Sequence, residues 1–357
     1  MHLNSLYIDS FRCIRECNIR PSERINCIVG DNASGKTSVL ESIYLLGRGQ
    51  SFRQNQLSKA IRENADAFTI RGRAQENGQQ QLTRLGCHVT GRSAQFKLDN
   101  LTATRRYDLV AALPLQHIDP NVHRLLEQGP QHRRHFLDWG VFHVEHAFFP
   151  AWRRYRRALK QRNRALRFHR PKHEVIAWDN ELVGQGEIVD ACRRRYLELI
   201  KKQLPENTNA LIGEDALEFH YQPGWRGDDG YGAALAGSLE QDIKARITQN
   251  GPHRADIRVN IAATRARDWV SRGQQKILTA ALLLAQAHIL YTLKNVRPIL
   301  LIDDMAAELG KQYRETLAEE ILRCGAQSFV TFLDPSLIPR AFQDQTLFHV
   351  EQGRVSA

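Results

Sequence analysis

The chain has 357 residues, of which 42% are hydrophobic and 25% charged. That length and apolar content can bury a full core in two or three structural units, and they exclude a mainly disordered chain. Lys and Arg number 50 against 39 Asp and Glu, and the resulting net charge of +11 is typical of proteins that meet polyanions.

The N-terminal residues lack the basic start and apolar run of a signal peptide, so we expect a cytoplasmic protein. Six cysteines are scattered without a CxxC pair, which predicts reduced thiols. Four histidines lie between 132 and 146, but no third ligand follows at convincing spacing, so we expect no zinc site.

A strand–loop–helix pattern begins at Arg24. A β-prone run at 24–29 is followed by Gly-x-x-x-x-Gly-Lys-Thr and then by apolar residues at helical spacing. This context predicts a phosphate-binding P-loop, in which Lys36 reaches the β- and γ-phosphates of ATP and Thr37 ligates Mg²⁺. The expected nucleotide-binding residues are Gly30, Asp31, Asn32, Ala33, Ser34, Gly35, Lys36, Thr37 and Ser38.

Strand-like and helix-like segments alternate up to about residue 122, and the chain from 123 to 214 is mainly helical and basic. Its most basic part, 151–172, holds ten Lys and Arg and no Asp or Glu, interleaved with apolar residues at roughly helical spacing. One face of such a helix can pack, and its uncompensated charge favours polyanion contact over a merely solvated surface. The residues expected to contact a polyanion such as nucleic acid are Arg153, Arg154, Arg156, Arg157, Lys160, Arg162 and Arg164.

Two further motifs follow near the C-terminus. Ser271-Arg272-Gly273-Gln274 precedes a long apolar stretch at 277–293, which we interpret as a buried helix because it is too short for a comfortable membrane span. Ser271 can cap this helix, and Gly273 lets a phosphate approach its first turn. An apolar run at 298–302, typical of a buried parallel strand, ends in Asp303 and Asp304, which we expect to hold Mg²⁺ and to polarise water, respectively.

The chain resembles the RecF family of recombinational-repair ATPases, which is related to the SMC and Rad50 heads. The resemblance is carried by segments that ABC-type ATPases in general do not share. These are Phe11-Arg12, Leu46–Arg53, Arg133–Gly140, Leu159–Asn163 and Gly251–Asp256, together with Ser271–Gln274.

The resemblance implies an α/β fold, an ABC-type P-loop ATPase head with a mixed sheet and an inserted, mainly helical basic arm lobe. The expected parts are residues 1–122 and 263–357 for the ATPase lobe, 123–214 for the arm, and 215–262 for a mixed connection. It also implies that Gln116 ligates Mg²⁺, senses the γ-phosphate and takes part in catalysis. The segment Ser271, Arg272, Gly273 and Gln274 would act in trans, closing over ATP held by a second subunit.

The implied function is an ATP-dependent homodimer that clamps double-stranded DNA or single-strand gaps and hydrolyses ATP slowly. Its implied partners are RecR with RecO, and RecA, which it helps to load, in support of replication restart and SOS induction. One position departs from the family pattern, because Gly310 stands where the family usually carries Asp. Thr331 stands where transporter ATPases carry a switch His, a position at which RecF-like proteins often carry Thr or Ser.

Three other classes compete. A transporter ATPase subunit would have a shorter arm and a coupling surface for a membrane partner, and a metabolic P-loop kinase needs no second motif near 271. An SMC-like structural protein would need a long heptad coiled coil, which the sequence lacks.

Overall fold

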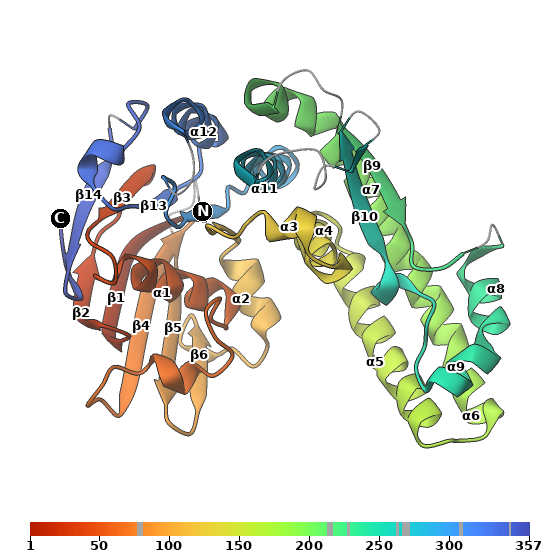
Figure 1. The fold of residues 1–357 in the computed structure, drawn as a ribbon. Helices are drawn as coiled ribbons and strands as arrows, with labels where there is room; N and C mark the ends of the chain where they lie inside the picture. The colour runs from red at the N-terminus through yellow and green to blue at the C-terminus, as the bar shows by residue number, and fades with distance from the viewer. Residues whose placement is uncertain are drawn as a thin grey trace. The chain divides into compact units, whose positions relative to one another are not determined.

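The computed structural model describes residues 1–76, 81–212, 217–226, 229–261, 264–265, 272–306, 310–342 and 344–357. The chain divides into two compact units (Figure 1). Residues 1–122 and 276–357 form the first unit, and residues 123–275 form the second, which is inserted into it. The sequence predicted a separate connection at 215–262, whereas the structure groups those residues with the helical insertion.

A mostly parallel sheet carries the P-loop. Its strand order is β15-β14-β3-β13-β12-β8, and β15 alone of these six runs antiparallel to its neighbour. The strands are β15 (Arg354–Ser356), β14 (Thr346–Glu351), β3 (Ile25–Val29), β13 (Ser328–Phe332), β12 (Ile299–Ile302) and β8 (Leu115–Ile118). Every residue of β3, β12 and β13 is buried, as the apolar runs in the sequence predicted.

A second sheet of the same unit is antiparallel, with the order β2-β1-β4-β5-β6-β7. The strands are β2 (Ile14–Ile19), β1 (His2–Phe11), β4 (Ala67–Gln75), β5 (Leu82–Thr90), β6 (Ala94–Leu98) and β7 (Leu101–Thr102). Helix α1, Lys36–Arg48, packs against strands of both sheets, and its apolar side chains share one core with them. Helix α1 therefore packs between strands of the two sheets, which Figure 1 shows in the same unit.

Within the described residues, the first unit also contains α2 (Arg106–Ala112), most of α11 (Arg272–Lys294) and α12 (Lys311–Cys324). The stretch at 277–293 is a buried helix, as expected, although the longer segment Gly273–Lys294 of α11 is long and apolar enough to cross a membrane by length and composition alone. However, 78% of the relevant window is buried inside the protein, as in the core helix of a soluble domain.

The second unit is mainly helical. Helices α5 and α7 run side by side as a long hairpin joined by α6 (Figure 1). The helices are α3 (Arg124–Glu127), α4 (Pro130–Val144), α5 (Phe148–Arg167), α6 (Lys172–Ile176), α7 (Asp179–Ile212), α8 (Gly230–Gly237) and α9 (Leu239–Ala245). A small antiparallel sheet, β11-β10-β9, spans Thr264–Arg265, Asp256–Ile261 and Leu217–Gln222.

Candidate nucleotide-binding site and basic arm

The loop between β3 and α1 has the backbone of a P-loop. Gly35 has a φ of 123° and Ala33 a φ of 64°, and the helix begins directly at Lys36. Glycine is required at position 30 as well, because a Cβ there would lie 2.2 Å from the carbonyl oxygen of Val350. Successive backbone N–H groups at such a turn and at a helix N-terminus form an anion-binding concavity.

The side chains of Lys36 and Thr37 contact the loop and the strand-end acid, respectively. The Lys36 Nζ donates to the carbonyl oxygens of Gly30 and Asp31 at 2.6 and 2.7 Å, and burial lowers its pKa. The hydroxyl of Thr37 donates to Asp303, 3.1 Å from both carboxylate oxygens. The strand end carrying Asp303 thus meets the first turn of α1, as the two motifs required.

A polar chain links the two acids to the neighbouring strand. Thr331, fully buried on β13, donates its hydroxyl to Asp303 Oδ1 at 2.8 Å and accepts the backbone N–H of Asp304 at 2.7 Å. Asp304 has a φ of 49°, in the left-handed region that non-glycine residues seldom adopt. The hydroxyl of Thr331 therefore holds an unusual backbone conformation at the position expected to be catalytic.

The environment of Asp304 makes its carboxylate more basic. Burial raises its pKa, the charge of Asp303 raises it further, and Lys36 and Lys276 oppose the shift. A carboxylate with a raised pKa is the better general base.

These residues line a pocket of about 700 Å³. Its wall includes the whole loop from Asn32 to Ser38, together with Asp303, Asp304 and Thr331. It also includes the basic residues Arg12, Arg53 and Lys59 and the exposed thiol of Cys13. With Lys36, four cations surround one loop, an arrangement that suits a polyphosphate anion.

Arg12 is positioned by a carboxylate that sequence reasoning missed. Glu41, fully buried on α1, accepts hydrogen bonds from Arg12 Nε and Nη2 at 3.0 and 2.7 Å. Ser51 also donates to Glu41 at 2.5 Å, and Arg53 lies 3.8 Å from it. The segments containing Arg12, Ser51 and Arg53 supported the family resemblance, but no sequence pattern indicated that one buried acid joins them.

The donors at the strand end fit Mg²⁺. The hydroxyl of Thr37 and the carboxylate of Asp303 are hard oxygen ligands, and their separation lets one ion contact both. Within the described ranges there is no cluster of three or more His, Cys, Asp or Glu that could hold a metal. One or two protein oxygens are nevertheless sufficient for Mg²⁺, which takes its remaining ligands from phosphate and water.

Gln116 is not brought to this pocket, which corrects its expected roles in catalysis and metal binding. It is 4% exposed, and its Nε2 donates to Gln286 on α11 at 2.9 Å. In the sheet Gln116 pairs with Leu300 of β12, three residues before the acid at the end of that strand. Pro120, beyond the end of β8, lines the pocket instead.

The segment expected to act in trans is described only in part. Ser271 lies outside the described residues, while Arg272, Gly273 and Gln274 form the first turn of α11. Gly273 is half-buried and Gln274 is exposed. Their role toward a second subunit stays a prediction.

Helix α5 has one packed face, as its sequence predicted. Tyr155, Ala158, Leu159, Ala165 and Leu166 are buried, although Phe168 is 68% exposed. Six of the seven expected DNA-binding side chains are exposed and form no ion pair with any described residue. They are Arg153, Arg154, Arg156, Arg157, Lys160 and Arg164.

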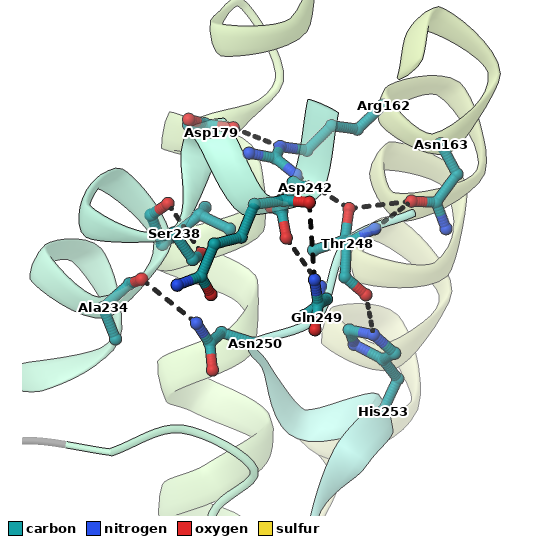
Figure 2. Close-up of polar contacts among 12 residues, drawn as sticks. Arg162, Asn163, Asp179, Ala234, Ser238, Asp242, Thr248, Gln249, Asn250 and His253 are labelled. Carbon is teal, nitrogen blue, oxygen red and sulfur yellow. Dashed lines mark hydrogen bonds and ion pairs between the residues drawn. The ribbon is translucent and has the colours of Figure 1, made fainter. Parts of the chain in front are cut away.

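Arg162 is the exception, and its assignment to DNA is wrong. Its side chain is fully buried, with Nε 2.7 Å from Asp179 Oδ1 and Nη1 2.6 Å from Asp242 Oδ2 (Figure 2). Nη1 also donates to the hydroxyl of Thr248 at 2.8 Å, and Asn163 accepts from the same hydroxyl. Arg162 therefore binds α7, α9 and the loop after α9 to α5.

Comparison with known proteins agrees with this fold. Residues 2–356 match the sequence profile of the family described as RecF/RecN/SMC N terminal domain. A fold of this kind with a P-loop and a strand-end acid defines the class of ABC-type P-loop ATPase heads.

More specific relatives are the proteins described as DNA replication and repair protein RecF. The one from Pseudomonas paraeruginosa is 40% identical, and the one from Azotobacter vinelandii 39%; each match covers 100% of this chain and 98% of the relative. The chain belongs to the RecF family.

Solved structures support the fold. The chain superposes with a TM-score of 0.87 on a structure described as the recombination mediator protein RecF-ATPrS in the RecFOR pathway, at 24% identity, covering 99% of this chain and 97% of that one. A structure described as RecF-ATP gives 0.85 with the same identity and coverage. An SmcHead structure bound to the C-winged helix domain of ScpA gives 0.61 at 14% identity, covering 100% of this chain and 96% of that one.

Proposed function

We propose that this protein is an ATP-controlled DNA-binding protein of recombinational repair, in which ATP serves as a switch. The observation that carries the proposal is the assembled site at the P-loop, where Thr37, Asp303, Asp304 and Thr331 form one hydrogen-bonded chain. The full-length similarity to RecF proteins directs that site toward DNA repair.

In this proposal Lys36 and the loop N–H groups bind the phosphates of ATP, and Thr37 and Asp303 hold Mg²⁺. When bound, Mg²⁺ would neutralise charge on the β- and γ-phosphates. Asp304 accepts a proton from the attacking water, a role that its raised pKa suits.

We infer that hydrolysis is slow. The carboxylate of Asp304 has one methylene less of reach than the Glu of many ABC ATPases, and its backbone conformation is fixed by Thr331. A turnover number above about 10 s⁻¹, the median for enzymes, would contradict this inference.

The remaining parts of the proposal concern assembly. Ser271 and Gly273 of one subunit would cover ATP bound to another, so that ATP drives formation of a homodimer that clamps gapped or duplex DNA and hydrolysis releases it. From the family resemblance we further propose that the protein acts with RecR and RecO, assists RecA loading, and supports replication restart and SOS induction in the cytoplasm.

We propose that the exposed face of α5 contacts DNA. Its six basic side chains have no carboxylate partner among the described residues, so duplex phosphates can neutralise them without breaking an ion pair. Such contacts give affinity without reading sequence.

The test is the variant with Arg153, Arg156 and Arg157 changed to Glu. Binding to all duplex sequences should weaken alike, and the log–log salt slope should flatten by about 0.9 for each phosphate that the variant no longer neutralises. ATP affinity should be unchanged, since the P-loop belongs to the other unit.

A control with the same charge change uses exposed arginines of the first unit, Arg24, Arg340 and Arg354, changed to Glu. If both variants bind DNA equally weakly, or if neither binds it less tightly than wild type, α5 is not the DNA-binding surface.

A further inference from the structure

The outer face of the antiparallel sheet carries an unusual charge pattern. Strands β4, β5 and β6 contain Arg71, Arg73, Arg84 and Lys97 but no Asp or Glu. Their alternate residues, such as Phe68, pack inward against α1. The four basic side chains therefore point outward, and all four are exposed. We call these four residues the cationic sheet face (β4, β5 and β6 in Figure 1).

The strand register brings like charges together. Arg73 of β4 lies directly opposite Arg84 of β5. Like charges in this position destabilise a sheet, and neither side chain forms an ion pair with any described residue. The acid next to this pair in the register is Asp99, whose carboxylate accepts a hydrogen bond from the backbone N–H of Arg84. Farther along the sheet, Asp9 of β1 lies opposite Thr69, two residues before Arg71 on β4.

A second feature lies in the next row of the same face. Arg71, Gly86 and Lys97 are consecutive cross-strand partners on β4, β5 and β6. Because Gly86 has no side chain, a hollow of about 220 Å³ opens between the two cations. Thr69, which bonds to His88 at 3.0 Å, and Gln95 complete its wall.

Neither packing nor backbone conformation requires this glycine. A Cβ at Gly86 would meet only the Cβ of Lys97, at 3.6 Å, which is an ordinary contact, and its φ is not in the left-handed region. Glycine within a strand weakens it and often marks the close approach of a ligand. The hollow and the opposed arginines thus point independently to an anion.

We propose that the cationic sheet face binds the phosphate backbone of duplex DNA, with one phosphate seated at Gly86 between Arg71 and Lys97. This inference rests on the proposed DNA-binding function and adds a contact surface on the ATPase unit. Single strands are usually bound through aromatic side chains on which bases stack. Strands β4, β5 and β6 present no outward Phe, Tyr or Trp, and the ring of Tyr7 on the neighbouring strand β1 is covered by the guanidinium of Arg71, so the face suits a duplex backbone.

The first test is Arg84→Glu, because this substitution separates folding from binding. It turns the opposed pair into an attractive Arg73–Glu pair, so the melting temperature should stay equal or rise. Binding of the full-length protein with ATP to a fluorescent 30-base-pair duplex should weaken. Raising the salt concentration from about 50 to 200 mM should weaken duplex binding by the variant less than binding by the wild type, by about 3.5-fold for each phosphate that the variant no longer neutralises. Arg24→Glu makes the same charge change away from this sheet and should leave both quantities near wild type.

The second test is Gly86→Val, which fills the hollow and keeps every charge. Duplex affinity should fall while the melting temperature is preserved, since a β-branched residue suits a strand. Unchanged affinity would overturn the seating of a phosphate at Gly86. A single strand of equal length should respond less to both substitutions; an equal or larger response would overturn the choice of a duplex.

The outcomes separate this inference from the proposed function. If charge reversal on α5 abolishes duplex binding while Arg84→Glu matches Arg24→Glu, the proposed function stands and the cationic sheet face is not a DNA site. If the wild-type protein binds no duplex with ATP, both proposals fail.

Discussion

Replacing Arg162 with Met should destabilise the inserted unit strongly without acting on a DNA contact. Met preserves most of the apolar stem but removes the charge between Asp179 and Asp242. Asp242 is fully buried, and without the Arg162 guanidinium its carboxylate would be left as an uncompensated charge in the core. Breaking one side of a buried ion pair costs about 3–5 kcal/mol of unfolding free energy.

Intrinsic fluorescence isolates this effect, because all five tryptophans of the chain lie within residues 123–275. With an m-value of about 2 kcal/mol/M, the urea midpoint of the fluorescence transition should fall by about 1.5–2.5 M. The control is Arg157→Met, an exposed arginine on the same helix, whose unfolding free energy should change by less than about 0.5 kcal/mol. Arg157→Met should weaken DNA binding instead.

The double variant Arg162→Met/Asp242→Asn tests the cause. Neutralising the stranded carboxylate should recover a large part of the stability, while Asn can still accept the backbone N–H of Gln249. Equal stability of Arg162→Met and Arg157→Met, or no recovery in the double variant, would refute the reasoning.

Four further predictions address the two units. Lys36→Ala should weaken ATP binding by about tenfold or more, since Ala cannot donate a charge-assisted hydrogen bond to phosphate. Calorimetry measures the ATP affinity, and an affinity equal to that of the wild type would exclude the P-loop assignment. Asp304→Asn should retain ATP binding, because Asn tolerates the left-handed backbone, and should slow hydrolysis by about 10²–10⁴-fold in a phosphate-release assay; a smaller effect would assign the base elsewhere. Ser271→Arg should leave ATP binding by the monomer intact but prevent ATP-dependent dimers in sedimentation, and dimers at wild-type ATP concentration would contradict closure in trans. Burial lowers the pKa of His253 to about 4, so the free energy of unfolding should decrease by about 3 kcal/mol as the pH falls from 6.5, the pKa in the unfolded chain, to 4. Urea unfolding should show a smaller effect of acid on the variant His253→Gln, and a pH profile identical to that of the wild type would contradict this assignment.

The parts of the site that follow from local pattern were predictable. The P-loop and the strand ending in Asp303 are contiguous motifs whose residues fix their own backbone geometry. Thr331 and Glu41 act through strand pairing and helix packing between segments far apart in the chain, and no local pattern encodes those contacts. Gln116 shows the same limit, because a four-residue strand does not reveal which face its amide occupies.

The burial of Arg162, in contrast, could be predicted from the sequence. It follows Tyr155 by seven residues and precedes Leu166 by four, which places it on the packed face of α5. The number of charges in the segment does not distinguish this position from the exposed ones. A basic residue at core spacing in an amphipathic helix predicts a buried ion pair, and here Asp179 and Asp242 supply it.

The measurement that tests the central claim most directly is sedimentation velocity of the full chain with gapped duplex DNA in ATP or ADP. The account predicts a dimer on the DNA with ATP and a monomer that binds weakly with ADP. Equal assembly and equal DNA binding with the two nucleotides would contradict ATP control.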